Sequence, residues 1–156
     1  MKDYWMVKQG SLQNETVNGE TVGFKFDVRI CEYRGCFLSL VVPYYIAVDG
    51  EEFSGESQTF EVNGKPPRTF DEIAKAIWEH WDYGDYATIH VRKPGGLTPG
   101  EHTLSVWQGL LTQYGWSTHD DQWCINPPVP GTVKGSFMGG GTGKQQFLFE
   151  FPMVVD

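Results

Sequence analysis

Apolar and polar residues alternate with a period of two through much of this chain. In residues 22–30 the apolar side chains occupy every second position, and polar residues such as Lys25 and Asp27 lie between them. Period-two alternation is typical of an antiparallel strand with one buried and one solvated face. Strand patterns recur in four further segments, residues 38–48, 87–92, 103–111 and 145–155. The chain is therefore predicted to be all-β, an antiparallel β-sandwich of jelly-roll-like type.

Turn-forming residues separate these segments. Asp49-Gly50 and Asn63-Gly64 are dipeptides that favour two-residue hairpin turns, and residues 94–100 (PGGLTPG) predict a turn-rich connector. Pro43 falls inside the 38–48 pattern and cannot donate a ladder hydrogen bond, so we expect an edge or a bulge there. No linker divides the 156 residues, so we expect a single domain over 1–156.

One segment has helical rather than strand spacing. Thr69 and Glu72 fit a capping box, the pair of side chains that satisfies the first free N–H groups of a helix. Apolar residues follow at positions that share one helical face: Phe70, Ile73, Ala74, Ile77, Trp78 and Trp81. The spacing predicts one short helix near 70–81.

A long irregular stretch, about 115–143, separates the last two predicted strands. Loops of this length in compact domains are usually functional or disordered. Disordered segments are poor in aromatic residues, whereas this one contains Trp116 and Trp123, so we expect a loop that packs against something. The indole groups, together with His119 and Asp121, are the candidate contacts to a substrate or a partner.

Composition excludes several classes of partner and location. Asp and Glu number 20 against 12 Lys and Arg, for a net charge of −8, which disfavours nucleic acid and anionic membrane surfaces. No apolar run approaches the 18 or so residues of a membrane span. Three cysteines (Cys31, Cys36 and Cys124) and no secretory signal predict reduced thiols in a cytoplasmic protein.

Other polar clusters have ordinary structural interpretations. His80, Asp82 and Asp85 lack a familiar ligand spacing and fit a helix end followed by a turn. Residues 139–144 (GGGTGK) resemble a phosphate-binding loop, but Met138 stands where its first glycine belongs and no Ser or Thr follows the lysine. A flexible connector is expected there.

No catalytic or metal-ligating residue is therefore assigned to this chain. The cysteines are expected to be buried thiols, and His90 and His102 to face outward from strands. Three function classes remain: a subunit that docks on a catalytic partner, a stand-alone carbohydrate- or aglycone-binding module, and a small β enzyme that uses His119 and Asp121.

Four segments carry a resemblance to a known family. They are residues 33–40 (YRGCFLSL), 48–51 (VDGE), 81–87 (WDYGDYA) and 91–102 (VRKPGGLTPGEH). In these runs the chain resembles the small (β) subunit of bacterial C-glycoside deglycosidases. The resemblance covers about residues 1–114 and the closing strand, and residues 115–143 are less familiar.

The resemblance implies a function in a hetero-oligomer. The small subunit of this family pairs with a large (α) subunit that is similar to sugar-phosphate isomerases, a (β/α)8 barrel with a divalent metal, Mn or Mg. The complex cleaves the C–C bond between sugar and aromatic aglycone in 3-oxo-C-glycosides, such as those of flavonoids. The keto group acidifies the neighbouring C–H, so that a base and a metal-stabilised enolate let the aglycone leave. The metal and the base belong to the large subunit, and no cofactor is expected in this chain.

Overall fold

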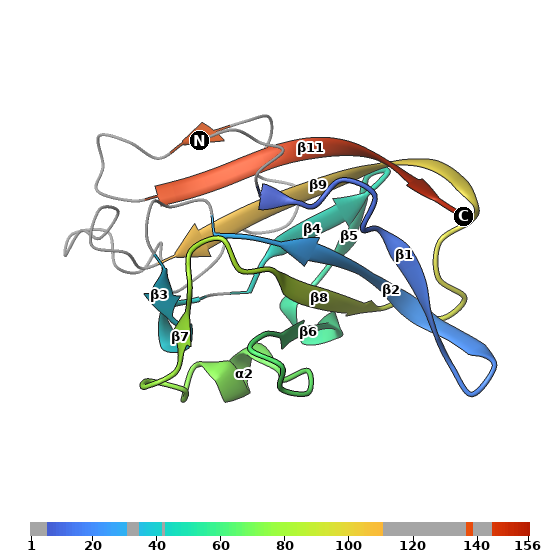
Figure 1. Cartoon of the computed structure of the whole chain (residues 1–156). Coiled ribbons are helices and arrows are strands. Elements are labelled where there is room, and N and C mark those ends of the chain that lie inside the picture. The colour runs from blue at the N-terminus through green and yellow to red at the C-terminus, as the bar shows by residue number, and fades with distance from the viewer. Residues whose placement is uncertain (1–5, 31–34, 42, 111–136, 139–144) are drawn as a thin grey trace.

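The protein folds into two main antiparallel sheets and one small one (Figure 1). The computed structural model describes residues 6–30, 35–41, 43–110, 137–138 and 145–156. The first sheet has the order β1 (Gln13–Val17), β2 (Glu20–Val28), β8 (Ala87–Arg92), β6 (Gln58–Glu61). The second has the order β10 (Phe137–Met138), β11 (Gln145–Val155), β9 (Gly100–Leu110), β4 (Tyr45–Val48), β5 (Glu51–Phe53). The small sheet pairs β3 (Cys36–Phe37) with β7 (His80–Trp81). Short helices complete the described elements: η1 (Leu38–Leu40), η2 (Gly55–Ser57) and α2 (Phe70–Ile73).

The alternation in β2 sets which face of the first sheet is buried. Phe24, Phe26 and Val28 have no exposed surface, while Lys25 and Asp27 between them are partly exposed on the other face. Phe26 pairs with Ile89 of β8, which is equally buried. The apolar side chains of the two strands therefore form one continuous buried face, as the sequence pattern predicted.

The buried faces of the two main sheets pack against each other. The ring of Phe24 from β2 meets the ring of Phe53 from β5 edge to face, with centroids 5.1 Å apart. The ring of Tyr44, just before β4, lies near that of Phe60 of β6, with centroids 6.2 Å apart and the rings tilted by 30°. These contacts join both sheets in one hydrophobic core, which confirms the all-β class with antiparallel strands. Jelly-roll-like connectivity stays a prediction.

The predicted hairpin turns are confirmed. Asp49 and Gly50 both have positive φ, 50° and 86°, and they join β4 to β5 with Val48 opposite Glu51. Asn63 and Gly64 have φ of 59° and 72° after β6. Asn, Asp and Gly tolerate this left-handed region better than other residues, which is why these dipeptides identified the turns.

The predicted strand over 38–48 is wrong in its first half. Leu38–Leu40 forms a 3-10 turn instead, closed by the Val41 N–H donating to the Leu38 carbonyl at 3.0 Å. Pro43 has no N–H to donate, and the strand begins only at Tyr45. Leu38 is nevertheless fully buried, so its apolar character reflects the core and not a strand.

The predicted helix near 70–81 is much shorter than expected. Its capping box is present: the Thr69 hydroxyl accepts from the Glu72 N–H at 3.2 Å, and the Glu72 carboxylate accepts from the Thr69 N–H at 2.9 Å. The helix ends at Ile73, however, and Trp81 lies in β7 opposite Cys36. The β3–β7 pairing satisfies backbone groups that a longer helix would take, so tertiary contacts override the local helical spacing.

The closing strands β9 and β11 pair in register from Gly100 to Leu110. Phe151, Met153 and Val155 are buried on one face of β11, as the alternation predicted. Phe137–Met138 pairs with β11, so this part of the 115–143 stretch is a strand and not irregular as expected. In the part of the chain that the structure describes, no helix is long and apolar enough to cross a membrane.

Candidate functional site

The four residues proposed from sequence as contacts lie outside the described residues: Trp116, His119, Asp121 and Trp123. The strands that flank their stretch are described. Leu110 at the end of β9 pairs with Gln145 at the start of β11. Both strand ends lie at the same end of the molecule as β3 and β7 (Figure 1). The chain therefore enters and leaves the predicted functional stretch at this end.

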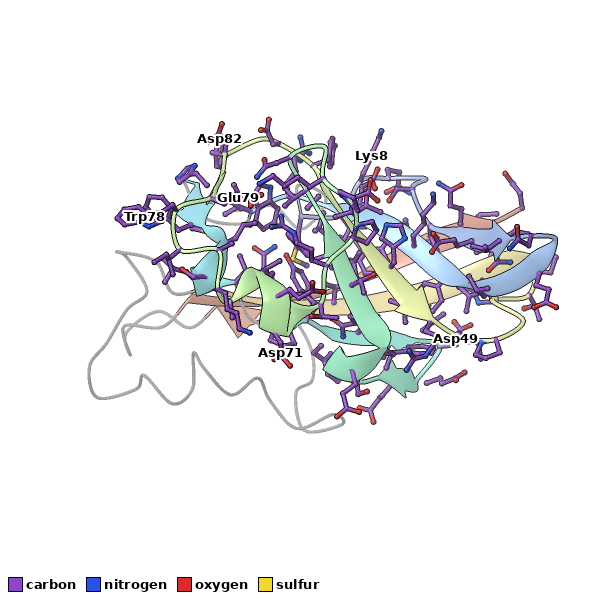
Figure 2. The ribbon with its side chains drawn as sticks, turned by 90° about the horizontal axis from the view of Figure 1, so that it is seen from below. Lys8, Asp49, Asp71, Trp78, Glu79 and Asp82 are labelled. Carbon is purple, nitrogen blue, oxygen red and sulfur yellow. The ribbon has the colours of Figure 1, made fainter. Side chains whose placement is uncertain are left out.

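Exposed apolar side chains gather at this same end. Trp78 is 87% exposed, its neighbour Ile77 is 55% exposed, and Phe37 of β3 is 42% exposed. The ring of His80 lies edge to face on Phe37, with centroids 5.2 Å apart. Figure 2 shows the Trp78 side chain pointing away from the sheets at the edge of the molecule. We call Phe37, Ile77, Trp78 and His80 the aromatic end.

A rigid frame holds the aromatic end in place. Trp81 is fully buried, and its indole N–H donates to the Asp85 carbonyl at 3.0 Å. The Glu79 carboxylate accepts two hydrogen bonds from the Arg68 guanidinium, at 2.9 and 2.8 Å, and one from Lys65 at 2.9 Å. The bonds from Arg68 hold the pKa of Glu79 far below its usual range. Glu79 and Trp81, which follow Trp78 in the chain, are therefore held in place by these bonds and by burial.

His80 and Asp82 form a hydrogen-bonded pair in this region. Asp82 Oδ1 lies 2.6 Å from His80 Nδ1, and no described residue bonds the Nε2 atom on the other side of the ring. The carboxylate on Nδ1 orients the His80 imidazole. The predicted helix end is wrong, because His80 lies in β7, whereas the turn that follows is confirmed by the Asp85 N–H bonding the Asp82 carbonyl.

His90 lies on the outer face of β8, as predicted. The prediction for His102 is wrong, because its side chain is only 8% exposed and lies on the same face of β9 as buried Leu104 and Val106. The carboxylate partners of both histidines were missed. Glu15 binds His90 Nδ1 at 2.9 Å and Glu61 binds Nε2 at 2.6 Å. Neither imidazole has a free ring nitrogen, since His102 Nδ1 and Nε2 bind Asp49 and the Thr98 carbonyl, each at 2.6 Å. Both histidines are thus engaged in holding strands and loops together and cannot accept a proton from a substrate.

Electrostatics support a stabilising role for His102. The hydrogen bonds to the Thr98 carbonyl and to Asp49 raise its pKa above the ordinary value. The Thr103 N–H donates to Asp49 at 2.8 Å, and this bond, with that of His102, lowers the pKa of Asp49. Such partners on neighbouring elements depend on strand register, which is why sequence spacing alone did not reveal them.

Buried polar and thiol groups do not form a reactive site. Burial raises the pKa of the Cys36 thiol to about 12, so it stays protonated, as expected of a buried structural cysteine. Cys31 and Cys124 lie outside the described residues. Gln108, fully buried, donates to the Tyr44 hydroxyl at 2.7 Å and to the Arg29 carbonyl at 3.0 Å. Within the described ranges, no group of three or more His, Cys, Asp or Glu residues could hold a metal ion.

Comparison with known proteins decides the family. A model of the family described as C-glycoside deglycosidase beta subunit matches residues 2–114, which is more than half of the chain. The chain belongs to this family. The match includes β1 to β9 and the whole aromatic end, and so confirms the resemblance seen in the sequence motifs.

A curated relative agrees with this assignment. The C-glycoside deglycosidase beta subunit of Eubacterium cellulosolvens (strain ATCC 43171 / JCM 9499 / 6) is 38% identical over 97 residues. The aligned part is 62% of this chain and 65% of the relative, so the chain spans slightly less than two thirds of that protein's length.

Proposed function

We propose that this chain is the small subunit of a hetero-oligomeric C-glycoside deglycosidase. In this proposal a metal-dependent, barrel-type large subunit cleaves the C–C glycosidic bond of 3-oxo-C-glycosides with aromatic aglycones. The observation that carries the proposal is the family match over residues 2–114. The relative from Eubacterium cellulosolvens is named a beta subunit, and a subunit requires a partner chain.

In the proposed reaction this chain contributes structure and not the reacting groups. A divalent metal, Mn or Mg, and the base belong to the large subunit. The keto group at C3 acidifies the adjacent C–H at C2, and a base of the large subunit takes that proton. The electron pair left at C2 forms a C1=C2 double bond as the bond from C1 to the aglycone carbon breaks, and the aglycone carbon keeps the electron pair of that bond and takes up a proton. The small subunit supports assembly and covers the shared site with residues 115–143, where Trp116, His119, Asp121 and Trp123 would meet substrate or partner.

Co-expression with a large (α) subunit of a C-glycoside deglycosidase tests this proposal. The pair should elute as one complex on size exclusion and release aglycone from an oxidised C-glycoside, while the small subunit alone should not. Metal-dependent turnover by the isolated chain would instead support the small β enzyme that uses His119 and Asp121. Tight binding of the oxidised glycoside by the isolated chain, without assembly, would support the stand-alone binding module.

A deletion tests the proposed covering role of the loop. Replacing residues 116–142 with a short Gly-Ser turn should leave a folded protein, because the described core residues lie elsewhere. We expect either failed assembly or turnover at least about tenfold lower, a barrier change of about 1.4 kcal/mol. Unchanged assembly together with unchanged turnover would show that the loop has no role at the shared site.

A further inference from the structure

We propose that the aromatic end is the surface through which this chain binds the large subunit. This inference rests on the proposed function. It adds the location of the interface and the chemistry of the surface that fits it. The partner surface would offer an apolar hollow for the Trp78 indole, with an acidic side chain opposite Lys75.

The distribution of exposed apolar side chains points to this surface. Large hydrophobic side chains that are exposed among the described residues are Val17, Phe37, Ile77, Trp78, Tyr83, Tyr86 and Val154. Phe37 lies on β3, while Ile77, Trp78 and Tyr83 lie on or beside β7, and the β3–β7 pairing brings these segments together. Scattered exposed apolar residues are normal, but a cluster of them marks an interaction site. Tryptophan is also the residue type most enriched where binding energy concentrates.

The backbone that carries Trp78 is already ordered. The Glu79 N–H donates to the Ala76 carbonyl at 3.2 Å, and the Leu38 N–H donates to the Glu79 carbonyl at 2.8 Å. Asn63 Nδ2 adds a bond to the His80 carbonyl at 3.0 Å. An indole presented from a fixed backbone loses little conformational entropy on binding, which favours association. The Trp78 indole is therefore exposed on a hydrogen-bonded part of the fold.

Charge around Trp78 defines the partner further. The hollow beside it is lined by Lys65 and Lys75, and Lys65 is 54% exposed. The carboxylate of Glu79 in the same hollow is paired with Arg68 and with Lys65 itself. Exposed carboxylates are also present, on Glu72 three residues before Lys75 and on Asp82, which is 72% exposed. Lys75, exposed in the hollow and outside the Glu79 ion pairs, is therefore the lysine that would meet a carboxylate of the partner.

A protein surface fits this region better than a small ligand. Small-molecule sites are concave and enclose most of the ligand. Ile77 and Trp78 line only an open hollow that leaves them 55% and 87% exposed, and Trp78 stands at the edge of the molecule (Figure 2). The strand ends that flank residues 115–143 lie at the same end of the molecule (Figure 1), so a large subunit seated there would also meet the proposed covering loop.

Binding of the untagged full-length chain to the immobilised large subunit tests the inference. Trp78→Ala should weaken binding at least about tenfold, as expected for a central aromatic contact, and Ile77→Ala and Lys75→Glu should weaken it to a smaller extent. Val17→Ala is the matched control for Ile77→Ala, because Val17 is 49% exposed and lies in the β1–β2 hairpin at the opposite end. It should change affinity less than about twofold.

The outcomes separate this inference from the function on which it rests. If the wild-type chain fails to bind the large subunit, the proposed function is wrong, and so is the proposed interface. If the wild-type chain binds and assembles, but Trp78→Ala and Ile77→Ala bind equally well, the interface lies elsewhere and the function stands. Loss of oxidised-glycoside binding by the isolated Trp78→Ala chain, with assembly unchanged, would also overturn the inference in favour of a ligand site. Circular dichroism of each variant controls for folding.

Discussion

Two histidine–aspartate pairs at opposite ends of the molecule have the same distance and different surroundings. His80 and Asp82 at the aromatic end are 2.6 Å apart, as are His102 and Asp49 at the other end. His80 is 43% exposed and its partner is two residues away, whereas His102 is 8% exposed and its partner is 53 residues away. Figure 2 shows Asp82 and Asp49 toward the two ends of the molecule. We call Asp49, Thr98, His102 and Thr103 the turn end.

This difference separates a pair that holds two parts of the fold together from a pair that is exposed to a binding partner. At the turn end, both ring nitrogens of His102 are bonded and Asp49 also accepts the Thr103 N–H, so the pair joins the β4–β5 turn to the start of β9. At the aromatic end, the pair is local and lies beside exposed apolar side chains. A fully hydrogen-bonded pair such as His102–Asp49 stabilises the fold. An exposed pair beside apolar surface, such as His80–Asp82, suits the binding of a partner protein.

The largest expected effect is at the buried base of the aromatic end. Trp81→Ala should lower the free energy of unfolding by about 3–5 kcal/mol, the range for removing a buried aromatic side chain. Trp81 is fully buried and its ring lies 5.2 Å from that of Phe60. Denaturant titration of the isolated chain measures the loss. A loss below about 1 kcal/mol would show that the aromatic end is not anchored in the core.

A smaller effect is expected in the connector that leads into the turn end. Gly95 and Gly96 have φ of 84° and 64°, so an alanine at either costs about 1–2 kcal/mol. At Gly96 the new Cβ would also lie 2.5 Å from Asn14 Oδ1, which accepts the Leu97 N–H, while at Gly95 it meets nothing within 4 Å. Gly96→Ala should therefore melt at a lower temperature than Gly95→Ala. Equal melting temperatures would mean that Asn14 moves aside freely.

Local sequence patterns predicted the elements that local physics determines. The alternation in residues 22–30 identified the buried face of β2, because a strand has two faces and one of them is covered. Asp49-Gly50 and Asn63-Gly64 identified turns, because few residues adopt positive φ. The capping box at Thr69 identified the start of the helix, because its two side chains satisfy N–H groups that the first turn leaves free.

Features that depend on distant neighbours were missed. The spacing of Trp78 and Trp81 suits one helical face, yet pairing with β3 places Trp81 in the core and leaves Trp78 exposed. The carboxylates around His90 come from β6, which pairs with β8, and from β1, which lies beyond β2, so they depend on the strand order of the sheet and not on local sequence. The candidate residues Trp116, His119, Asp121 and Trp123 remain predictions, because they lie outside the described residues.

The pH dependence of stability should separate the two histidine pairs. The folded pKa of His102 is raised above its ordinary value of 6.5, so its stabilisation is complete below pH 6.5 and is lost as the pH rises through the folded value. Asp49 has a lowered folded pKa, so its own stabilisation is lost only as the pH falls below its ordinary value of 3.8. The loss on the alkaline side should be under about 1 kcal/mol, as for a partly exposed ion pair.

Paired variants measure this contribution. His102→Asn should remove the alkaline-side decrease in unfolding free energy, whereas His80→Asn should leave it in place, because His102 and its partners are unchanged in that variant. Urea titrations from about pH 5 to pH 9 give the curves, with the wild-type chain as reference. Identical pH profiles for wild type and His102→Asn would show that the His102–Asp49 pair does not cause the alkaline-side loss of stability.

The smallest expected effect is the stability change on truncating Trp78. With 87% of its surface exposed, Trp78 buries little apolar area in the isolated chain, so Trp78→Ala should change the unfolding free energy by less than about 0.5 kcal/mol. Its denaturant m-value should also match that of the wild type, since the surface exposed on unfolding is nearly the same. Urea titration of both proteins measures the two quantities. A loss above about 1 kcal/mol would mean that the indole packs on its own chain, and its exposure could then no longer be taken as surface kept for a partner.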